Sequence, residues 1–399
     1  MKSVFFITKD IMHRNYIEPY SDLLWKTPNI AELARKGTVF MKHYTAAPST
    51  NMAAGCMFTG VYPYQNGLKY FVPAPKYQGE TLFDIMHNRG YNCHIIWASI
   101  DIEEYANCFG DYIKIHHFGR RQPVGPHNKA GDNIPNDDAE LEKSTQVILD
   151  TIDECLKEEP VFIWMHLPHV IKGRNGYGTD IDWFDDLIGF IRQRFDDDCL
   201  FISADHGHMN LTKGKCCYGW DVYEDAAHIP LIAPKISGLD TVDFPTDNTQ
   251  LTEIIADRKV THRKYVLSDT AYWGQHQRKL AIISGDYKYI FNRQGEREEL
   301  YDLKYDPHEE VNLIEELIYD TDRMMYYVRR QIYYYPREEE AQRMLAFFRE
   351  KKREIWRQTG WLSYKYSSLR MFTRNLTHLI LGRSNFSKLQ AIKKAFSKK

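Results

Sequence analysis

The sequence lacks the features that mark membrane-spanning, secreted and zinc-ribbon proteins. No apolar run in its 399 residues approaches the roughly 18 that a membrane-spanning helix needs. The opening stretch MKSVFFITKDIMHRN has an apolar segment that is too short for the core of a signal peptide. The seven cysteines are an odd number and include no C-x-x-C pair, so they suggest neither a disulfide scaffold nor a zinc or redox motif. We therefore expect a soluble, cytoplasmic protein with reduced thiols.

Acidic residues are absent from the C-terminal segment 355–399, which contains ten Lys or Arg residues. Residues 1–354, in contrast, carry 42 basic and 54 acidic side chains. Within the segment, one helical face would hold Phe386, Leu389, Ile392 and Phe396, with lysines around the rest. This pattern is typical of a basic amphipathic helix at an anionic membrane, so we expect peripheral association with the inner membrane face. The alternative is a solvated helix end. We expect no nucleic-acid partner, because the body is acidic and has no recognisable nucleic-acid motif.

Hydrophobic patterning predicts an α/β fold. Apolar, β-branched or aromatic runs predict buried strands at 4–8, 161–165 and 200–204. Helical patterns separate these strands, at 29–36, 81–88, 138–157 and 182–195. Strands that alternate with helices indicate a mostly parallel central sheet between two helical layers.

The C-terminal third has a different pattern. Short strands are expected at 279–283, 287–292 and 298–303, which would form a small antiparallel sheet. From about residue 319 the chain becomes helical. We therefore predict a core over 1–260, a small sheet subdomain packed on it over 261–318, and a helical basic extension over 319–399.

Polar residues follow each of the three predicted parallel strands. Asp10 comes just after the first strand, His166 to His169 end the second, and Asp205 to His208 follow the third. In such sheets ligands bind at the carboxyl ends of the strands, so these three groups should meet at one edge. Asp10, Asp205 and His206 would then offer two carboxylates and one imidazole, a set suited to Mn²⁺, Zn²⁺ or Mg²⁺. The alternative is a turn in which Asp205 caps a helix.

A second candidate is the stretch APSTNMAAG, in which Ser49 and Thr50 precede a helical pattern. One interpretation is that either hydroxyl caps the helix. The other is that a helix N-terminus holds an anionic group while a hydroxyl attacks it, with the nearby metal lowering the pKa of that hydroxyl. The local pattern leaves both open.

Several ordered segments resemble the sulfatase-like branch of the alkaline phosphatase superfamily, from residue 3 to about 313. The segments are TPNIAELARKGTVFMKHYTAAPST at 27–50, FTGVYPYQNG at 58–67, HLPH at 166–169, SADHGH at 203–208, YEDAAHIPLI at 223–232 and GDYKYIFNRQGEREELYDLKYDPHEEVNL at 285–313. The resemblance implies a three-layer core of the alkaline phosphatase type.

The sequence departs from true sulfatases at the reactive residue. Sulfatases carry Cys or Ser in a C/S-x-P-x-R motif and convert it to formylglycine, whereas this chain has Thr50 there and lacks the Pro and Arg. Asp10 is followed by Ile11 instead of a second aspartate. The lysine and histidine positions that contact sulfate in the family fall on Ala98, Ile100 and Gly219. Sulfate ester hydrolysis through formylglycine is therefore not expected.

The pattern around Thr50 is instead similar to lipoteichoic acid synthases and phosphoethanolamine transferases, which form a phosphothreonine intermediate. This resemblance implies that one divalent metal ion, Mn²⁺ or Zn²⁺ in preference to Mg²⁺ or Ca²⁺, is bound by a set of four residues, namely Asp10, Thr50, Asp205 and His206. Thr50 would be the nucleophile, and His169 or, as second choice, His166 would assist the leaving group.

Further residues are candidate substrate contacts. His208 and His228 could contact an anionic substrate, although His208 could equally be a solvent-facing histidine. His116, Arg120 and Arg121 form part of a basic cluster that suits a diphosphate or nucleotide, with a solvated basic loop as the alternative.

We therefore expect a metal-dependent phosphoryl or substituted-phosphoryl transferase. Its donor would contain phosphate, and its acceptor would be a cell-surface polysaccharide or a lipid-linked precursor. One alternative is a hydrolase of phosphodiesters, phosphonate esters or sulfate esters. The other is a non-catalytic binding protein that retains the fold.

Overall fold

The computed structural model describes ten segments of the chain, at 1–21, 25–67, 77–97, 109–117, 138–168, 176–210, 212–270, 278–292, 298–314 and 337–358. Three of the predicted site residues, His169, Arg120 and Arg121, lie outside these segments. So does most of the basic tail, from residue 359 onward.

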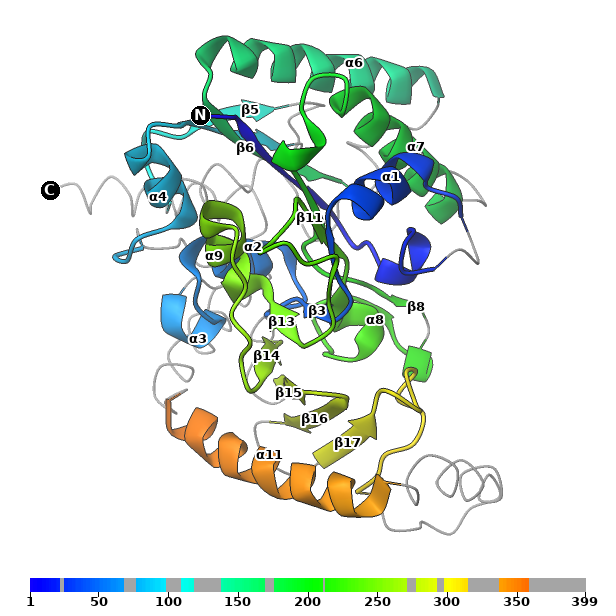
Figure 1. The fold of residues 1–399 in the computed structure, drawn as a ribbon. Helices are drawn as coiled ribbons and strands as arrows, with labels where there is room; N and C mark the ends of the chain where they lie inside the picture. Colours follow the sequence, from blue (N-terminus) through cyan, green and yellow to red (C-terminus); the bar gives the residue numbers. More distant parts are fainter. Residues whose placement is uncertain are drawn as a thin grey trace, which may run out of the picture.

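The centre of the fold is an eight-stranded sheet in the order β12-β2-β11-β7-β1-β6-β4-β5 (Figure 1). Strands β1 (Val4–Lys9), β6 (Val161–Leu167), β7 (Leu200–Ala204), β4 (Asn92–Trp97) and β5 (Lys114–His117) run parallel. β11 (Leu231–Ala233) runs antiparallel to β7 and to β2 (Thr38–Phe40), and β12 (Thr241–Val242) completes the sheet. β1, β6 and β7 are buried along their whole length, which explains their continuous apolar runs.

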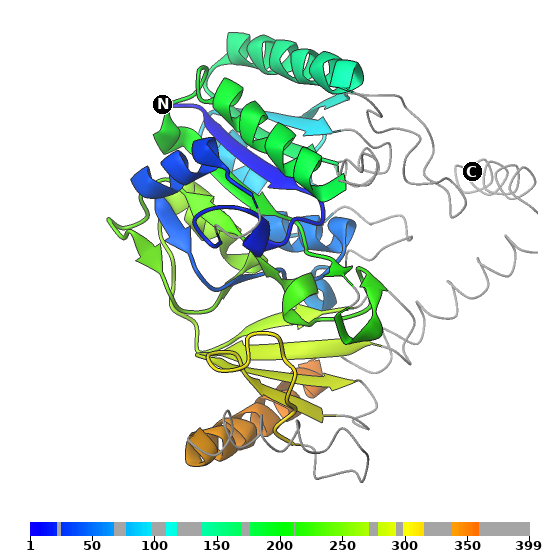
Figure 2. The same ribbon diagram turned by 90° about the vertical axis from the view of Figure 1, so that its right-hand side faces the viewer.

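Helices cover both faces of this sheet, which gives the predicted three layers (Figure 2). One face packs on α1 (Pro28–Lys36), α6 (Asp138–Cys155) and α7 (Gly176–Ile191). The other packs on α2 (Thr50–Thr59), α4 (Leu82–Asn88) and α9 (Leu251–Asp257). Side chains of β1 alternate between the two cores, as the period of two in a strand requires.

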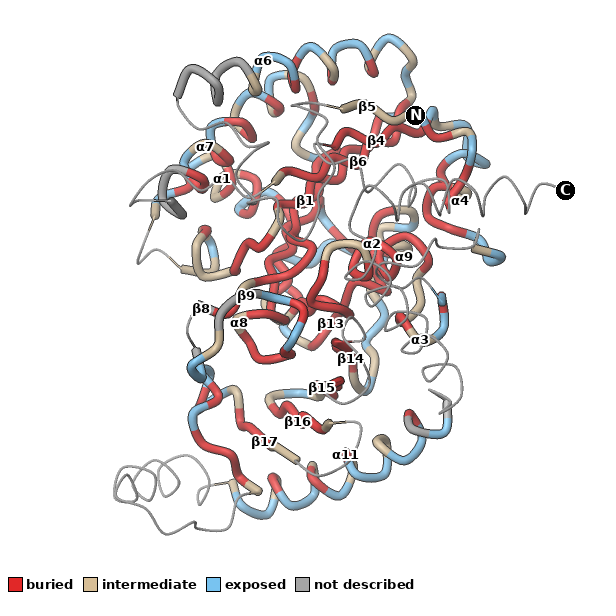
Figure 3. The backbone as a smooth tube through the Cα atoms, turned by 180° about the vertical axis from the view of Figure 1, so that it is seen from behind, coloured by how far each residue is buried: buried red, intermediate tan, exposed pale blue. Residues whose placement is uncertain are grey.

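A second sheet lies below the first, in the order β14-β15-β16-β17. Its antiparallel strands are β14 (Val266–Asp269), β15 (Lys279–Ser284), β16 (Tyr287–Asn292) and β17 (Glu298–Asp302). The amphipathic helix α11 (Glu338–Gln358) packs on one face, with its buried and exposed stripes visible in Figure 3. The other face packs on the core near Tyr44 and Tyr223.

Shorter elements connect these layers. They are β3 (His43–Tyr44), α3 (Pro63–Asn66), β8 (Met209–Asn210), β9 (Cys216–Cys217), α8 (Glu224–Ala227), β10 (His228–Ile229) and β13 (Thr246–Asp247), with single-turn 3-10 helices at 14–16, 156–158, 197–199, 212–214 and 248–250.

The predicted α/β class and its mostly parallel sheet are confirmed. The three short C-terminal strands are also present, and the sequence analysis missed β14. Residues 355–358 complete α11, where Ile355 is buried in the core of the small sheet, so the start of the basic tail is part of a packed helix. In the part of the chain that the structure describes, no helix combines the length and the apolar character required to cross a membrane.

Candidate active site

Two of the predicted metal ligands follow residues that are paired in the sheet. β1 and β7 are parallel neighbours in which Lys9 pairs with Ala204. Asp10 and Asp205 are the next residues of the two strands, so both chains leave the sheet at the same point of its carboxyl edge. The register of one strand pair thus brings together two carboxylates that are almost 200 residues apart.

Side-chain atoms of Asp10, Asp205 and His206 converge at this edge, all within 4.8 Å of one another. The Nε2 atom of His206 lies 3.7 Å from Asp10 Oδ1 and 3.4 Å from Asp205 Oδ2. Thr50 Oγ1 lies 3.2 Å from the same Nε2 atom. All four residues of the predicted metal set therefore meet at one place.

The hydrogen bonds of these residues leave the converging atoms available. His206 Nδ1 lies 2.8 Å from the carbonyl oxygen of Gly207, which can only accept a hydrogen bond, so in the neutral ring Nδ1 carries the proton and Nε2 presents a lone pair. Asp205 Oδ1 accepts a hydrogen bond from the backbone N–H of His206. One oxygen of each carboxylate, Asp10 Oδ1 and Asp205 Oδ2, is buried without a hydrogen-bond partner.

Burying two carboxylate oxygens close together without a hydrogen-bond donor is energetically unfavourable, because both charges lose water and repel each other. Burial, and then the charge of Asp205, raises the pKa of Asp10. A divalent cation would satisfy both oxygens and the lone pair of His206 at once. The residues present therefore fit a metal with mixed oxygen and nitrogen ligands.

The glycine of the D-H-G triplet has a steric role. A Cβ atom on Gly207 would lie 2.0 Å from the carbonyl oxygen of Asp225, at the start of α8. The backbone N–H of Gly207 also donates a hydrogen bond to the carbonyl oxygen of Ala226. The close approach of these two segments fixes the turn that presents Asp205 and His206, so the triplet is more than a generic turn.

Thr50 is the first residue of α2, and Ser49 occupies the N-cap position. The Ser49 side chain makes no capping hydrogen bond, and its buried Oγ has no partner. The interpretation of these hydroxyls as side-chain caps is therefore wrong for Ser49, while Thr50 directs its hydroxyl to His206. The first-turn amides of α2, which have no intrahelical acceptors, lie beside Thr50 and favour an anionic group there.

His166 lies beside this group, with its Nε2 atom 3.8 Å from Asp205 Oδ2. The ring stacks on Trp97, and burial lowers the pKa of the imidazole to about 3. Thr8 Oγ1 accepts a hydrogen bond from Trp164 Nε1 and lies 2.9 Å from His166 Nδ1. If the Thr8 hydroxyl donates to Nδ1, the proton of the neutral ring sits on Nε2. His206 then offers a lone pair to the site, and His166 offers a donor.

Two further features surround the site, and neither was predicted from the sequence. The Tyr218 ring stacks on His206 with centroids 4.4 Å apart. The buried Lys9 ammonium pairs with Asp180 on α7 at 2.8 Å and donates to the carbonyl of Pro168, next to Asp10. Neither residue belongs to a recognisable local motif, so only the tertiary contacts identify them.

The other predicted substrate contacts behave differently from one another. His208 is partly exposed, with its ring 6.3 Å from that of Tyr218. His228 is buried, and its two nitrogens already contact Glu224 and the carbonyl of Met41, so the structure gives it an internal role instead of an anion contact. His116 lies in a separate cluster with His94 and Cys155, and is therefore not brought to the metal group.

The family model described as Sulfatase matches residues 2–235, more than half of the chain. No functionally curated protein matches the sequence.

Solved structures with the same fold include sulfatases and a phosphonate monoester hydrolase. A putative sulfatase from Bacteroides thetaiotaomicron has a TM-score of 0.66 and 14% identity, covering 92% of this chain and 94% of its own. A 2-O GAG sulfatase gives the same TM-score and identity over 90% and 92% of the two chains. The phosphonate monoester hydrolase of Agrobacterium radiobacter has a TM-score of 0.62 and 13% identity over 88% and 96%.

At these identities the structural likeness is one of fold, while the family match rests on the sequence itself. The chain therefore belongs to the sulfatase family of the alkaline phosphatase superfamily, whose members are generally metal-dependent enzymes.

Proposed function

We propose that this protein is a metal-dependent hydrolase of phosphodiesters or phosphonate esters that acts through Thr50. The observation that carries the proposal is the contact of Thr50 Oγ1 with His206 Nε2, beside two unpartnered carboxylate oxygens. The similar solved structures include a phosphonate monoester hydrolase, which supports the hydrolase alternative more than the transferase expected from the Thr50 pattern.

Asp10, Asp205, His206 and the Thr50 hydroxyl would hold the metal. An ion bound there would lower the pKa of the hydroxyl and offset negative charge on the phosphoryl group. The single imidazole among the ligands favours Mn²⁺ or Zn²⁺ over Ca²⁺ or Mg²⁺.

The residues of the chain then account for binding and attack. The first-turn amides of α2 bind the phosphoryl oxygens, and His166 donates a hydrogen bond from Nε2. The Thr50 Oγ–P bond forms as the bond from phosphorus to the leaving oxygen breaks, and the leaving alcohol carries away a proton equivalent to the one that Thr50 loses.

Water completes the reaction in a second step. A water oxygen bonds to phosphorus, the Thr50 Oγ–P bond breaks, and Thr50 regains a proton as the acid product leaves. Formylglycine chemistry is not proposed, because Thr50 cannot be oxidised to that aldehyde and the flanking Pro and Arg are missing.

The transferase hypothesis differs only in the second step, where an alcohol would replace water. A glycan or a lipid-linked acceptor fits that hypothesis, and residues 355–399 would keep the protein at the membrane that carries it. This version stays a prediction, and the product formed in the presence of an acceptor distinguishes it from hydrolysis.

The test uses a 4-nitrophenyl phosphonate ester with the metal-stripped protein reloaded with Mn²⁺. We expect a burst of nitrophenolate and, after acid quenching, a phosphonylated peptide that contains Thr50. Adding glycerol should leave the burst unchanged and yield a glycerol ester only if the protein also transfers the group.

Two variants complete the test. Thr50→Ser keeps a hydroxyl and should retain part of the activity, whereas Thr50→Ala should lose both the burst and the modified peptide. Equal activity of wild type and Thr50→Ala would refute the nucleophile. Absence of both metal binding and turnover would favour the non-catalytic alternative.

A further inference from the structure

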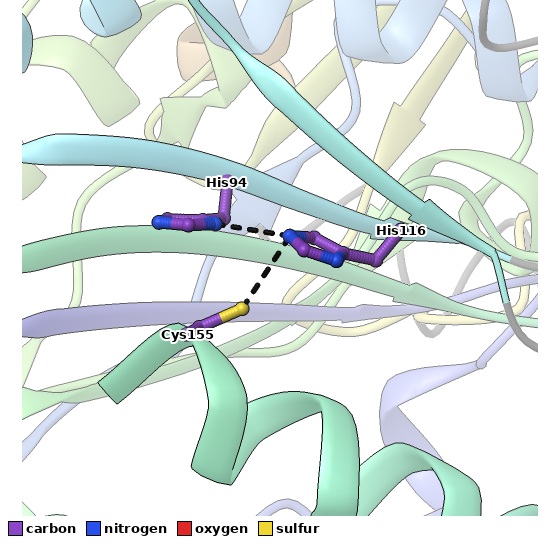
Figure 4. Close-up of side chains that lie close together, drawn as sticks. All are labelled: His94, His116 and Cys155. Carbon is purple, nitrogen blue, oxygen red and sulfur yellow. Dashed lines mark hydrogen bonds between the residues drawn. The ribbon is translucent and has the colours of Figure 1, made fainter. Parts of the chain in front are cut away.

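A second cluster of potential metal ligands lies on the sheet face opposite His166. His94 is on β4, His116 is on the edge strand β5, and Cys155 is the last residue of α6 (Figure 4). His94 shares its side of β4 with Ile96, which packs in the core beneath α6 and α7. The cluster is thus separate from the group around Asp10 and plays no part in the mechanism above.

The distances within the cluster suit a tetrahedral metal ion. His94 Nδ1 lies 3.0 Å from His116 Nε2, and the same Nε2 atom lies 3.6 Å from Cys155 Sγ. All three ligand atoms lie within 4.8 Å of one another. Zinc bonds of about 2.0–2.1 Å to nitrogen and about 2.3 Å to sulfur would place tetrahedral ligands roughly 3.3–3.6 Å apart. Small side-chain adjustments would therefore complete the geometry.

Hydrogen bonding alone accounts poorly for this arrangement. His116 Nε2 has either one proton or one lone pair, yet it faces both the imidazole of His94 and the thiol of Cys155. Only one good hydrogen bond can form at that atom. A cation between the three atoms would accept one lone pair from each of them.

Glu158 lies on the side of His94 where a metal-binding histidine usually has a carboxylate, although His94 Nε2 is buried and makes no hydrogen bond in this structure. Its Oε2 atom lies 3.8 Å from His94 Nε2 and is held there by Lys114, which donates to the same oxygen. If the proton of His94 is on Nε2, facing this carboxylate, then Nδ1 presents its lone pair to the cluster. Carboxylates commonly orient ligand histidines in this way.

We propose that His94, His116 and Cys155 form a second metal site, suited to Zn²⁺, with Glu158 orienting His94. Two imidazoles and a thiolate are ligands that Zn²⁺ prefers, and three protein ligands leave a fourth position for water. The site would fasten β5, the edge strand, to β4 and to the end of α6. Because binding requires the folded arrangement, zinc should raise the unfolding temperature.

The protonation states set the cost of binding. Burial lowers the pKa of His94 to about 4 and also lowers that of His116, so both imidazoles are neutral and ready to bind. Burial raises the pKa of the Cys155 thiol to about 12, so zinc must displace its proton.

Cobalt absorption provides a direct test, because thiolate coordination gives Co²⁺ an intense near-ultraviolet charge-transfer band. The Asp10 group has only oxygen and nitrogen ligands and cannot produce that band. We expect the metal-stripped full chain to show the band with Co²⁺ and to lose it when Zn²⁺ is added. Asp205→Asn, which alters the other site, should keep it.

Variants locate the site. Cys155→Ser and His116→Ala should both lose the band, whereas Cys93→Ser, which changes another buried free cysteine, should retain it. Glu158→Gln should weaken Zn²⁺ binding by about 10–100-fold without removing it. The rise in unfolding temperature with Zn²⁺ should disappear in Cys155→Ser.

Lack of a thiolate band in the wild-type protein would overturn the proposal, as would its persistence in Cys155→Ser. Thermal unfolding in a chelator shows whether each variant is folded. If His116→Ala is not folded, His116→Gln replaces it in the test. Hydrolysis through Thr50 is measured separately, so failure of either proposal leaves the other testable.

Discussion

Asp10→Asn should make the metal-free protein more stable while it abolishes metal binding. One carboxylate oxygen of Asp10 lies within 4.8 Å of one of Asp205, and Asp10 Oδ1 and Asp205 Oδ2 have no hydrogen-bond partner. An asparagine removes one negative charge, and its amide can donate to Asp205 Oδ2. The same change removes a ligand that a divalent cation needs.

The expected gain follows from the charge separation. Two unit charges 4.8 Å apart repel by about 3 kcal/mol at an effective dielectric constant near 20, and by about 1 kcal/mol in water. The Asp10 side chain is 25% exposed, so the gain should fall between these limits. Metal has the opposite effect, because it stabilises only the wild type: a ligand at 1,000 times its dissociation constant adds about 4.1 kcal/mol of stability, more than the expected gain of Asp10→Asn.

Thermal unfolding at mildly alkaline pH measures both effects. In a chelator, Asp10→Asn should unfold at a higher temperature than the wild type, and with saturating Mn²⁺ the order should reverse. Asp180→Asn is the matched control, because Asp180 pairs with the buried Lys9 at 2.8 Å. Its neutralisation leaves a buried charge unpaired and should cost about 3–5 kcal/mol in either condition.

Two outcomes would refute this reasoning. One is a lower unfolding temperature for Asp10→Asn than for the wild type in chelator, which would mean that the two carboxylates do not repel each other. The other is an equal rise with Mn²⁺ in both proteins, which would mean that Asp10 is not a ligand.

Three further predictions concern His166, Gly207 and His43. His166→Ala should lower kcat by about 10²–10³-fold at unchanged Mn²⁺ content, and His166→Gln, which keeps a donor, should recover part of it; loss of the metal instead would make His166 a ligand. Gly207→Ala should destabilise the protein by about 1–3 kcal/mol or more, because its Cβ meets the Asp225 carbonyl; unchanged thermal unfolding would contradict the close approach. Burial lowers the pKa of His43 to about 3, so its protonation in the unfolded state should cost up to about 1.4 kcal/mol for each pH unit below 6.5; denaturation from pH 7 to 4 should show a shallower decline for His43→Gln.

The local patterns predicted those parts of the fold that depend on neighbouring residues. Strands β1, β6 and β7 are buried on both sides, so their sequences are continuously apolar and easy to recognise. β14 was missed because its four residues, VLSD, carry little signal without the strand beside them. The predictions for His169, Arg120 and Arg121 stay untested, because these residues lie outside the part of the chain that the structure describes.

The candidate site was predictable to the extent that it follows strand ends. Asp10 and Asp205 come directly after β1 and β7, and His206 follows Asp205, so the rule that ligands bind at the carboxyl ends of strands was enough to group them. His228 is also an imidazole, but its two nitrogens are in hydrogen-bond contact with Glu224 and with the carbonyl of Met41. No local sequence pattern reveals these contacts.

The sequence by itself determined the layered α/β architecture, the family and the residue types at the carboxyl edge, because these depend on periodicity and on ordered motifs. The tertiary structure decided which hydroxyl faces His206, that His166 lies beside the same group, and that His94, His116 and Cys155 meet. These properties depend on distances between segments far apart in the chain. A spacing rule such as C-x-x-C detects ligands that are neighbours in sequence, and the three residues of this cluster become neighbours only when β4, β5 and α6 pack together.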